Sequence, residues 1–301
     1  MISVVICTYN RAKYLTRSLE CLTKQENVSP VDFEIVVVNN NCTDTTEEIC
    51  ETFEKNNPLL NFVYVKESNP GLSFARNKGI ATAKGDIVSF IDDDGFARKD
   101  YLEQIGLYIQ KYPDYVAYGG KVIPIYNEGK EPKWMSKYIE GIVSTLDFGD
   151  QVQPFTKKYP VGCNMYFKAE YFKKYGGFNT DLQLRSDEKY VFNKMKENGY
   201  DMLYTPEVYV NHFMDDFRVE EWFVRYLSQV VGNSERIRLK DTTIFAKFAK
   251  IIEYLLKYAA SLILAIGFLF QGQLAKAKYI ILVRWNVILG YFKKEVKKSK
   301  G

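Results

Sequence analysis

The stretch Ile87-Val88-Ser89-Phe90-Ile91-Asp92-Asp93-Asp94 decides how this chain folds. Its first five residues are mostly apolar and are typical of a strand buried on both faces of a sheet. Three carboxyl groups follow at once, and such a cluster beside a buried strand costs free energy unless something neutralises it. A divalent cation would do so, and carboxylate oxygens suit Mg²⁺ or Mn²⁺. The alternative is a solvated acidic turn.

The residues before this stretch alternate between apolar strands and amphipathic helices. Strands are predicted at residues 2–7, 33–38, 62–65 and 87–91, and helices at residues 14–24, 45–55 and 73–83. This alternation predicts an α/β fold with a largely parallel sheet. The polar runs Thr8-Tyr9-Asn10-Arg11 and Asn39-Asn40-Asn41 also follow strand ends. Because ligands of such sheets bind beyond the carboxyl ends of the strands, we expect these runs to meet the aspartates in one crevice.

The pattern is looser downstream of the aspartates. Further strands are predicted at residues 118–124, 161–167 and 207–210, and helices at residues 169–175 and 189–198. Residues 126–137 contain a proline, a tryptophan and several turn formers, which suits an ordered loop. We therefore expect the second half of the domain to complete the sheet around a less regular region.

The composition describes a chain that can bury a substantial core. It has 301 residues, 47% of them hydrophobic, a length that suits one large domain with an appendage. Its five cysteines stand at no metal-ligand spacing, which indicates reduced thiols in a cytosolic protein. The N-terminal apolar run is too short for a signal peptide. We expect a cytosolic body that binds no nucleic acid.

Charge is unevenly distributed along the chain. Residues 241–301 carry eleven basic and three acidic residues, a net charge of +8, so the remaining 30 basic and 34 acidic residues give residues 1–240 a net charge of −4. The basic tail is also apolar, with a helical stripe at 244–256, an uncharged run at 259–270 and an apolar run at 279–292 that Arg284 and Asn286 interrupt. Neither run reaches the roughly 20 residues that span a bilayer. We predict two amphipathic helices in the membrane interface; the alternative is a helical pair docked on the body or on a second subunit as a homodimer.

Four segments stand in an order that is specific to one enzyme family. They are ISVVICTYNR at 2–11, EIVVVNNNCTD at 34–44, NPGLSFARNKGI at 69–80 and GDIVSFIDDD at 85–94. Together they resemble the two opening strands, the following segment and the DxD motif of bacterial family 2 glycosyltransferases. The resemblance covers residues 1–215 and leaves out the tail. It implies a GT-A fold, which is a Rossmann-like, mixed but mainly parallel sheet flanked by helices, here followed by C-terminal amphipathic helices.

The resemblance also implies roles for individual residues of the first half. A nucleotide-sugar pocket would be lined by Thr8, Tyr9, Arg11, Asn40, Arg76, Asn77, Asp92 and Asp93. Asp94 would be the main ligand of Mn²⁺ or Mg²⁺, and Asp92 would be a further metal ligand on the ribose side. His212, the only histidine, stands where relatives contact metal or phosphate, although a lone histidine is often structural.

The acceptor half carries a weaker resemblance. Gly162 and Asn164 lie in a segment that resembles the strand beside the sugar, and Trp134 would either stack on a sugar or anchor its loop on the body. Asp187-Glu188 stands where the family places the Glu-Asp pair that supplies the catalytic base. The order is reversed here. The local pattern favours Asp187, whereas the distance to Gly199 favours Glu188, so both stay candidates.

These features predict an inverting, metal-dependent glycosyltransferase of class EC 2.4. It would move a sugar from a nucleotide diphosphate donor, with a UDP-sugar favoured, to a saccharide or lipid-linked acceptor in polysaccharide or glycolipid synthesis. We expect a catalytic domain at 1–240, divided into a nucleotide-sugar half at 1–115 and an acceptor half at 116–240, and a peripheral tail at 241–301 on the inner face of the cell membrane. The alternatives are a sugar nucleotidyltransferase and an inactive nucleotide-sugar-binding scaffold.

Overall fold

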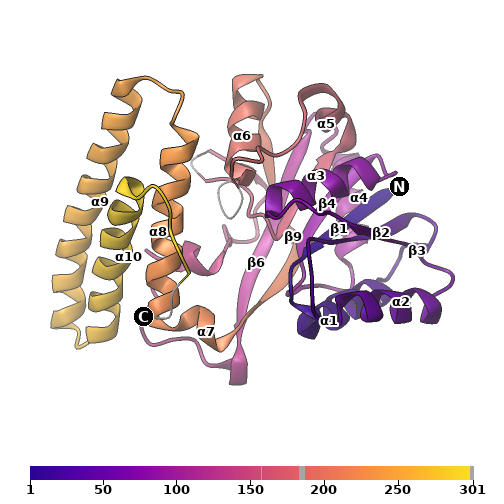
Figure 1. Ribbon diagram of the computed structural model, residues 1–301, viewed down its shortest axis with the longest axis horizontal. Helices are drawn as coiled ribbons and strands as arrows, with labels where there is room; N and C mark the ends of the chain where they lie inside the picture. The colour runs from indigo at the N-terminus through magenta and orange to yellow at the C-terminus, as the bar shows by residue number, and fades with distance from the viewer. Residues whose placement is uncertain (157, 183–186, 299–301) are drawn as a thin grey trace. The chain divides into compact units, whose positions relative to one another are not determined.

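The computed structural model describes residues 1–156, 158–182 and 187–298 (Figure 1). The chain divides into two compact units. Among the described residues, the first holds residues 1–124, 145–156, 158–182 and 187–213, and the second holds residues 125–144 and 214–298. The second unit therefore takes in a loop from the middle of the chain and begins before residue 240.

The first unit is built on a nine-stranded sheet with the strand order β3-β2-β1-β4-β8-β6-β9-β5, and with β7 beside β9. The strands are β1 (Ile2–Thr8), β2 (Phe33–Asn39), β3 (Asn61–Lys66), β4 (Ile87–Asp92), β5 (Gly95–Ala97), β6 (Ala117–Tyr126), β7 (Gln153–Pro154), β8 (Asn164–Lys168) and β9 (Met202–Met214). The first four run parallel, whereas β8 pairs antiparallel with β4 and β6, and β5 pairs antiparallel with β9. The predicted α/β fold with a mixed, mainly parallel sheet is confirmed.

Helices cover both faces of this sheet because successive strand residues point to opposite sides. Val4 and Ile6 of β1 pack with α1 (Ala12–Thr23), α2 (Thr46–Asn56) and α4 (Tyr101–Lys111). Val5 of the same strand packs on the other face with α3 (Leu72–Thr82), α5 (Ala169–Tyr175) and α6 (Asp187–Glu197). The sequence analysis did not predict α4. The two cores hold the carboxyl ends of β1, β2 and β4 at one edge of the sheet.

The second unit is helical. It contains α7 (Asp216–Val219), α8 (Glu221–Arg238), α9 (Ile244–Phe270) and α10 (Leu274–Phe292), with the 3₁₀ turns η1 (Asn127–Gly129) and η2 (Glu140–Val143) from the middle of the chain. α10 packs against both α8 and α9 (Figure 1). At the contact between α8 and α10, Gly232 and Gly290 let the two backbones approach closely. A Cβ built on Gly232 would lie 2.0 Å from the carbonyl oxygen of Val287.

The predicted tail helices are present. The prediction that no apolar segment of the tail is long enough to span a bilayer was wrong. The stripe at 244–256 and the apolar run at 259–270 join into one continuous 27-residue helix, α9. By length and composition this helix could cross a membrane, and it is the one such helix among the described residues. Its most apolar 18-residue window has a mean hydropathy of 1.7, and only 11% of that window is buried.

Candidate active site

The three aspartates lie where β4 ends, beside the end of β1. Thr8 donates a hydrogen bond from Oγ1 to Asp93 Oδ2 at 2.8 Å. Arg11 stands just before α1 and contacts two of the aspartates, with Nε 2.9 Å from Asp93 Oδ1 and a terminal nitrogen 2.5 Å from Asp94 Oδ2. The predicted meeting of the first strand end with the aspartates is therefore seen.

His212 of β9 lies beside the three aspartates, because it pairs with Gly95, the residue that directly follows them. Its Nε2 lies 3.2 Å from Asp94 Oδ1 and 3.9 Å from Asp92 Oδ2. Neighbouring ligands of an octahedral ion with bonds of about 2.1 Å stand about 3 Å apart. The imidazole nitrogen and the two carboxylates are therefore spaced as ligands of a small divalent cation would be.

Cys163 also lies at this cluster, and its sulfur, Asp92 and His212 place potential ligand atoms within 4.8 Å of one another. Burial raises the pKa of the Cys163 thiol well above its usual value, and the nearby aspartates raise it further. A thiol that keeps its proton is a poor ligand, and hard cations prefer oxygen. The fit therefore favours Asp92, Asp94 and His212 as ligands, with Cys163 as a neighbour. The sequence motif singled out its neighbours Gly162 and Asn164, and no role at the site was expected for Cys163.

The buried aspartates create an electrostatic problem that a cation would solve. Burial raises the pKa of Asp93 to about 7; the Arg11 guanidinium opposes this shift and the Asp94 carboxylate adds to it. Asp94 is fully buried. Arg11 offsets only part of the charge of Asp93 and Asp94, and the negative charge that remains lies in a poorly solvated place, which disfavours full ionisation. The electrostatics therefore agree with the spacing of the ligand atoms.

Arg76 of α3 joins the aspartates to the predicted base. It is only 3% exposed, and one terminal nitrogen lies 2.7 Å from Asp187 Oδ2 and 3.7 Å from Glu188 Oε2. The other terminal nitrogen lies 4.0 Å from Asp92 Oδ1. Burial alone would lower the pKa of Arg76, but these carboxylates raise it above its ordinary value, so the side chain stays charged. Gly162 makes room for it, since a Cβ there would lie 2.3 Å from the guanidinium.

The two candidate bases begin α6 and differ in their surroundings. Asp187 is fully buried against Arg76, and its Oδ1 accepts no hydrogen bond from the described residues. The Glu188 side chain remains 26% exposed. Burial raises the pKa of Glu188 to about 8, and the neighbouring Asp187 carboxylate raises it further. Glu188 therefore combines solvent access with a raised pKa.

Two predicted donor-site amides hold backbone segments in the structure. Asn40 donates from Nδ2 to the carbonyl oxygens of Glu67 and Asn69 and accepts a hydrogen bond from the Gly71 amide. Asn77 of α3 donates to the carbonyl oxygen of Phe178 and accepts from the amide of the same residue. Both side chains therefore shape the loops beside the strand ends, and their contacts with a nucleotide remain predictions.

Asn164 of β8 is buried inside the sheet. Its Nδ2 donates to the carbonyl oxygens of Lys121 and Val208, and its Oδ1 accepts from the Tyr101 hydroxyl. Both amide hydrogens are thus used to join β8 to β6 and β9. The structure gives Asn164 a role in the sheet, and the predicted contact with a sugar has no support from its geometry.

The two predicted aromatic contacts differ in exposure. Tyr9 is 62% exposed beyond the end of β1, where its ring could meet a base. Trp134 belongs to the second unit and is buried, with its ring stacked on Tyr279 at 4.6 Å and its Nε1 donating to the Val219 carbonyl oxygen. One face of Trp134 is therefore covered within the helical unit, which matches the loop-anchor alternative.

A known protein family matches more than half of this chain. The profile of glycosyl transferase family 2 matches residues 3–176. A glucosyl-dolichyl phosphate glucuronosyltransferase of Haloferax volcanii is 27% identical over 248 residues, which are 78% of this chain and 76% of that protein. The poly(ribitol-phosphate) β-N-acetylglucosaminyltransferase TarS of Staphylococcus aureus is 33% identical over 110 residues, which are 36% of this chain and 19% of TarS.

Solved structures show the same fold. The mannosyltransferase PcManGT of Pyrobaculum calidifontis, solved with GDP-Man and Mn²⁺, superimposes with a TM-score of 0.63 at 17% identity, covering 95% of this chain and 86% of that one. Residues 1–349 of S. aureus TarS give a TM-score of 0.54 at 17% identity, covering 100% and 97% of the two chains. At such identities the likeness concerns the fold.

Proposed function

The chain belongs to glycosyl transferase family 2, and on this premise we propose that it transfers a sugar from a nucleotide diphosphate donor to a saccharide or lipid-linked acceptor with inversion. The observation that carries the proposal is the position of Arg76, which lies between Asp92 on one side and the Asp187-Glu188 pair on the other. A single buried cation thus connects the predicted donor end with the predicted base.

On the donor side, Asp94, Asp92 and His212 would hold Mn²⁺ or Mg²⁺, and Thr8 and Arg11 orient the aspartates. The bound ion would stabilise the negative charge of the departing diphosphate. The donor class is supported by PcManGT with GDP-Man and by TarS with UDP. A UDP-sugar remains our favoured donor from the sequence resemblance.

On the acceptor side, inversion requires one carboxylate that takes the proton of the attacking hydroxyl group on the face opposite the leaving group. We assign this step to Glu188, because an acceptor can reach its half-buried side chain. Asp187 holds Arg76 at 2.7 Å and raises the pKa of Glu188. This assignment reverses the preference that the local sequence pattern gave to Asp187.

We place the protein at the cytoplasmic face of the cell membrane, with peripheral contact through residues 241–301. The long, apolar and largely exposed α9 supports this location, as do the eleven basic residues of the tail. A lipid-linked acceptor would lie at the same surface. The named relative from H. volcanii acts on a dolichyl phosphate, which is the same class of acceptor.

The test is nucleoside diphosphate release from a panel of UDP- and GDP-sugars with Mn²⁺. We expect Asp94→Ala to lower release at least about 100-fold, because loss of even an indirect metal contact costs about 10–100-fold. Chelation of the ion should have the same effect and should be reversed by added Mn²⁺. The control is Asp86→Asn, since this carboxylate is 90% exposed and pairs with the N-terminus.

Two other outcomes would contradict the proposal. Pyrophosphate formation from a sugar phosphate and a nucleoside triphosphate would identify a nucleotidyltransferase. Saturable binding of a nucleotide sugar without any release, across the whole panel and with several acceptors, would identify a binding scaffold.

A further inference from the structure

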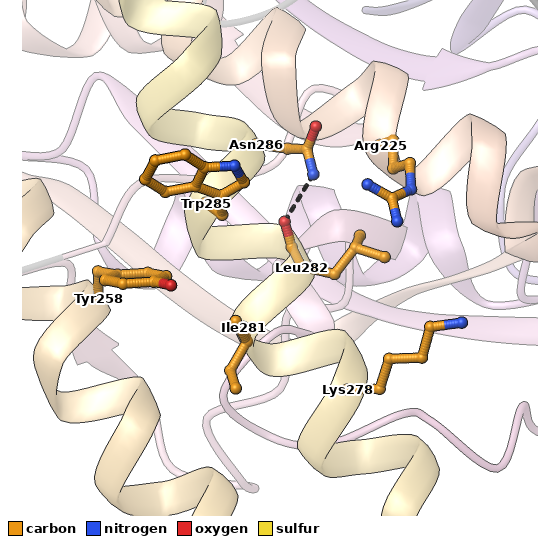
Figure 2. A pocket seen from close by; sticks show the side chains of 7 residues that line it. All are labelled: Arg225, Tyr258, Lys278, Ile281, Leu282, Trp285 and Asn286. Atoms are coloured by element: carbon orange, nitrogen blue, oxygen red, sulfur yellow. Dashed lines mark hydrogen bonds between the residues drawn. The ribbon is translucent and has the colours of Figure 1, made fainter.

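A groove in the second unit lies outside the chemistry described so far. It has a volume of about 330 Å³ and is lined by Arg225, Tyr258, Lys278, Ile281, Leu282, Trp285 and Asn286. Arg225 comes from α8, Tyr258 comes from α9, and the other five come from one face of α10. Figure 2 shows the two cations on one side of the groove and the two aromatic rings on the other, with Ile281 and Leu282 between them.

The cationic side is organised by one carboxylate. Glu221 accepts from Nε and a terminal nitrogen of Arg225 at its Oε1 and from Lys278 Nζ at its Oε2, at 2.5–2.9 Å. These hydrogen bonds lower the pKa of Glu221, and the bond from Lys278 contributes most to the shift. Two cations and one anion leave a net charge of +1. A guanidinium has five N–H groups and an ammonium has three, so both cations keep donors for a second anion.

The cations are also open to solvent. The side chain of Arg225 is 48% exposed and that of Lys278 is 60% exposed. An incoming phosphate could therefore reach both without displacing Glu221. Arginine and lysine are the side chains that proteins use for phosphate, the first through its planar fork and the second as a point charge.

The other side of the groove is amphipathic. The rings of Tyr258 and Trp285 lie 5.7 Å apart, and Trp285 is 45% exposed. Tryptophan and tyrosine favour the boundary between lipid chains and headgroups. Leu255 and Leu262 stand three residues before and four after Tyr258 on α9, so they continue its face. Both are exposed, at 52% and 40%.

The exposed apolar surface continues along α9. Its solvent-facing large apolar residues are Ile244, Phe245, Phe248, Ile252, Leu255, Leu256, Leu262, Ile263, Ile266, Leu269 and Phe270. Such a continuous apolar face beside cationic groups is typical of a helix that lies in the headgroup region of a bilayer.

We propose that this groove binds the phosphate headgroup of an anionic membrane phospholipid, with Arg225 and Lys278 contacting the phosphate and Trp285 and Tyr258 packing against the glycerol and upper chain. This proposal rests on the membrane contact that is part of the proposed function, and it specifies which lipid headgroup is bound and by which residues. It adds Arg225 of α8, which lies outside the tail, and it predicts selection of lipids by headgroup charge.

The first experiment uses soluble short-chain lipids on the full chain. Short-chain phosphatidylglycerol, below the concentration at which it forms micelles, should change the tryptophan fluorescence saturably, and Trp285→Phe should remove the change. Inorganic phosphate and short-chain phosphatidylcholine should do little. An equal response to inorganic phosphate would overturn the proposal in favour of a free-anion site, and an equal response to phosphatidylcholine would show that charge is not recognised.

The second experiment compares charge variants by flotation with phosphatidylcholine vesicles that do or do not contain phosphatidylglycerol. Replacing both Arg225 and Lys278 by glutamine should weaken binding to the anionic vesicles about tenfold or more, because each replacement removes a direct, charge-assisted hydrogen bond to the phosphate, and a hydrogen bond to a charged group contributes about tenfold. The matched control replaces Lys247 and Lys257 of α9 by glutamine. An equal loss of binding in the control would show that only the total charge of the protein matters, and it would contradict a headgroup site in the groove.

A third variant guards against a simple loss of folding. Glu221→Gln removes the negative charge beside the two cations and leaves the full charge of both to attract an anion, so it should strengthen binding to phosphatidylglycerol. Misfolding would not produce a gain, and unchanged or weaker binding in a folded Glu221→Gln chain would contradict the proposal.

The failures of the two proposals are distinguishable. If the wild-type chain does not float with any vesicle, the membrane contact itself is wrong. If it floats equally well with and without the two groove cations, the membrane contact stands and the headgroup site is wrong. Sugar transfer to a soluble acceptor should be the same in all these variants.

Discussion

At the scale of single residues, Arg76 organises the candidate active site. A buried cation requires compensation, and Asp187 at 2.7 Å supplies most of it while Glu188 and Asp92 lie further away. Removing one partner from a buried ion pair commonly costs about 3–5 kcal/mol, since the other charge is left unpaired. Variants of Asp187 therefore test folding as well as chemistry, whereas Glu188 can be replaced with less structural damage.

The base assignment predicts a specific result for Glu188→Gln. Its kcat should fall by about 10²–10⁴, the usual contribution of a general base, with little change in the KM for the donor. The pKa of Glu188 is raised to about 8, and a base acts in its deprotonated form. Transfer should therefore rise as the pH increases from 6 and level off above 8.

The control for this experiment is Asp187→Asn, which should lower the melting temperature because it leaves Arg76 without its main partner. A folded Asp187→Asn chain that loses transfer, together with an active Glu188→Gln chain, would move the base to Asp187. The rise of the wild-type rate with pH would then need another group.

At the scale of elements, close backbone approaches set the positions of the functional side chains. Gly162 precedes β8 and leaves space for the Arg76 guanidinium. Gly232 and Gly290 do the same for the backbones of α8 and α10, where a Cβ on Gly290 would lie 2.0 Å from the Gln229 carbonyl oxygen. At each of these positions the lack of a Cβ atom allows the two elements to come into close contact.

Gly162→Ala should therefore impair transfer more than it impairs folding. The added Cβ would lie 2.3 Å from the Arg76 guanidinium, so the side chain must move away from Asp92 and Glu188. We expect kcat to fall at least about tenfold, because misplacing a catalytic group by 1 Å can cost about 100-fold. The control is Gly106→Ala in α4, where a Cβ meets nothing within 4 Å; an equal loss there would contradict this explanation.

Gly232→Ala should destabilise the helical unit. The new methyl group would overlap backbone atoms of α10, and overpacking of this kind typically costs about 1–3 kcal/mol. Gly267→Ala in α9 is the matched control, since its Cβ would meet nothing within 4 Å and alanine favours a helix by about 1 kcal/mol over glycine. Denaturant unfolding of both variants checks the difference, and equal stabilities would refute the close contact.

At the scale of the whole molecule, the chain combines two units of different chemistry. Most of the aspartates and glutamates, and the candidate active site, lie in the sheet unit. The helical unit carries the basic tail and the exposed apolar face of α9. So large an exposed apolar area is unusual for a protein face that contacts only water. It indicates that this face contacts a membrane or another protein.

Charging the exposed face of α9 should separate membrane contact from folding. Phe248 and Ile263 are 61% and 73% exposed, so replacing both by glutamate should leave the melting temperature nearly unchanged. We expect flotation with anionic vesicles to be lost, because two charges would enter the apolar part of the interface. Leu59→Glu in the sheet unit, at 82% exposure, is the control. Unchanged flotation of the double variant would exclude α9 as the contact.

The fold class and the order of the motifs can both be predicted from local sequence patterns. Strand and helix periodicities are local, and the four buried strands with polar ends could be read from neighbouring residues alone. The same local reading missed α4, and it divided α9 into two segments because charged residues interrupt the first of them. Local patterns carry little information about where elements begin, end or join.

Which polar side chains are available for chemistry depends on contacts that form in the folded chain. The ion pair between Arg76 and Asp187 joins residues 111 positions apart, and the amides of Asn40, Asn77 and Asn164 are engaged with backbone groups of distant segments. Residue type indicates what a side chain can donate or accept, whereas burial and partners depend on contacts between segments far apart in the chain. For that physical reason the sequence determined the acidic cluster and the family, and the folded chain decided that Glu188 is reachable and that Asp187 is held by Arg76.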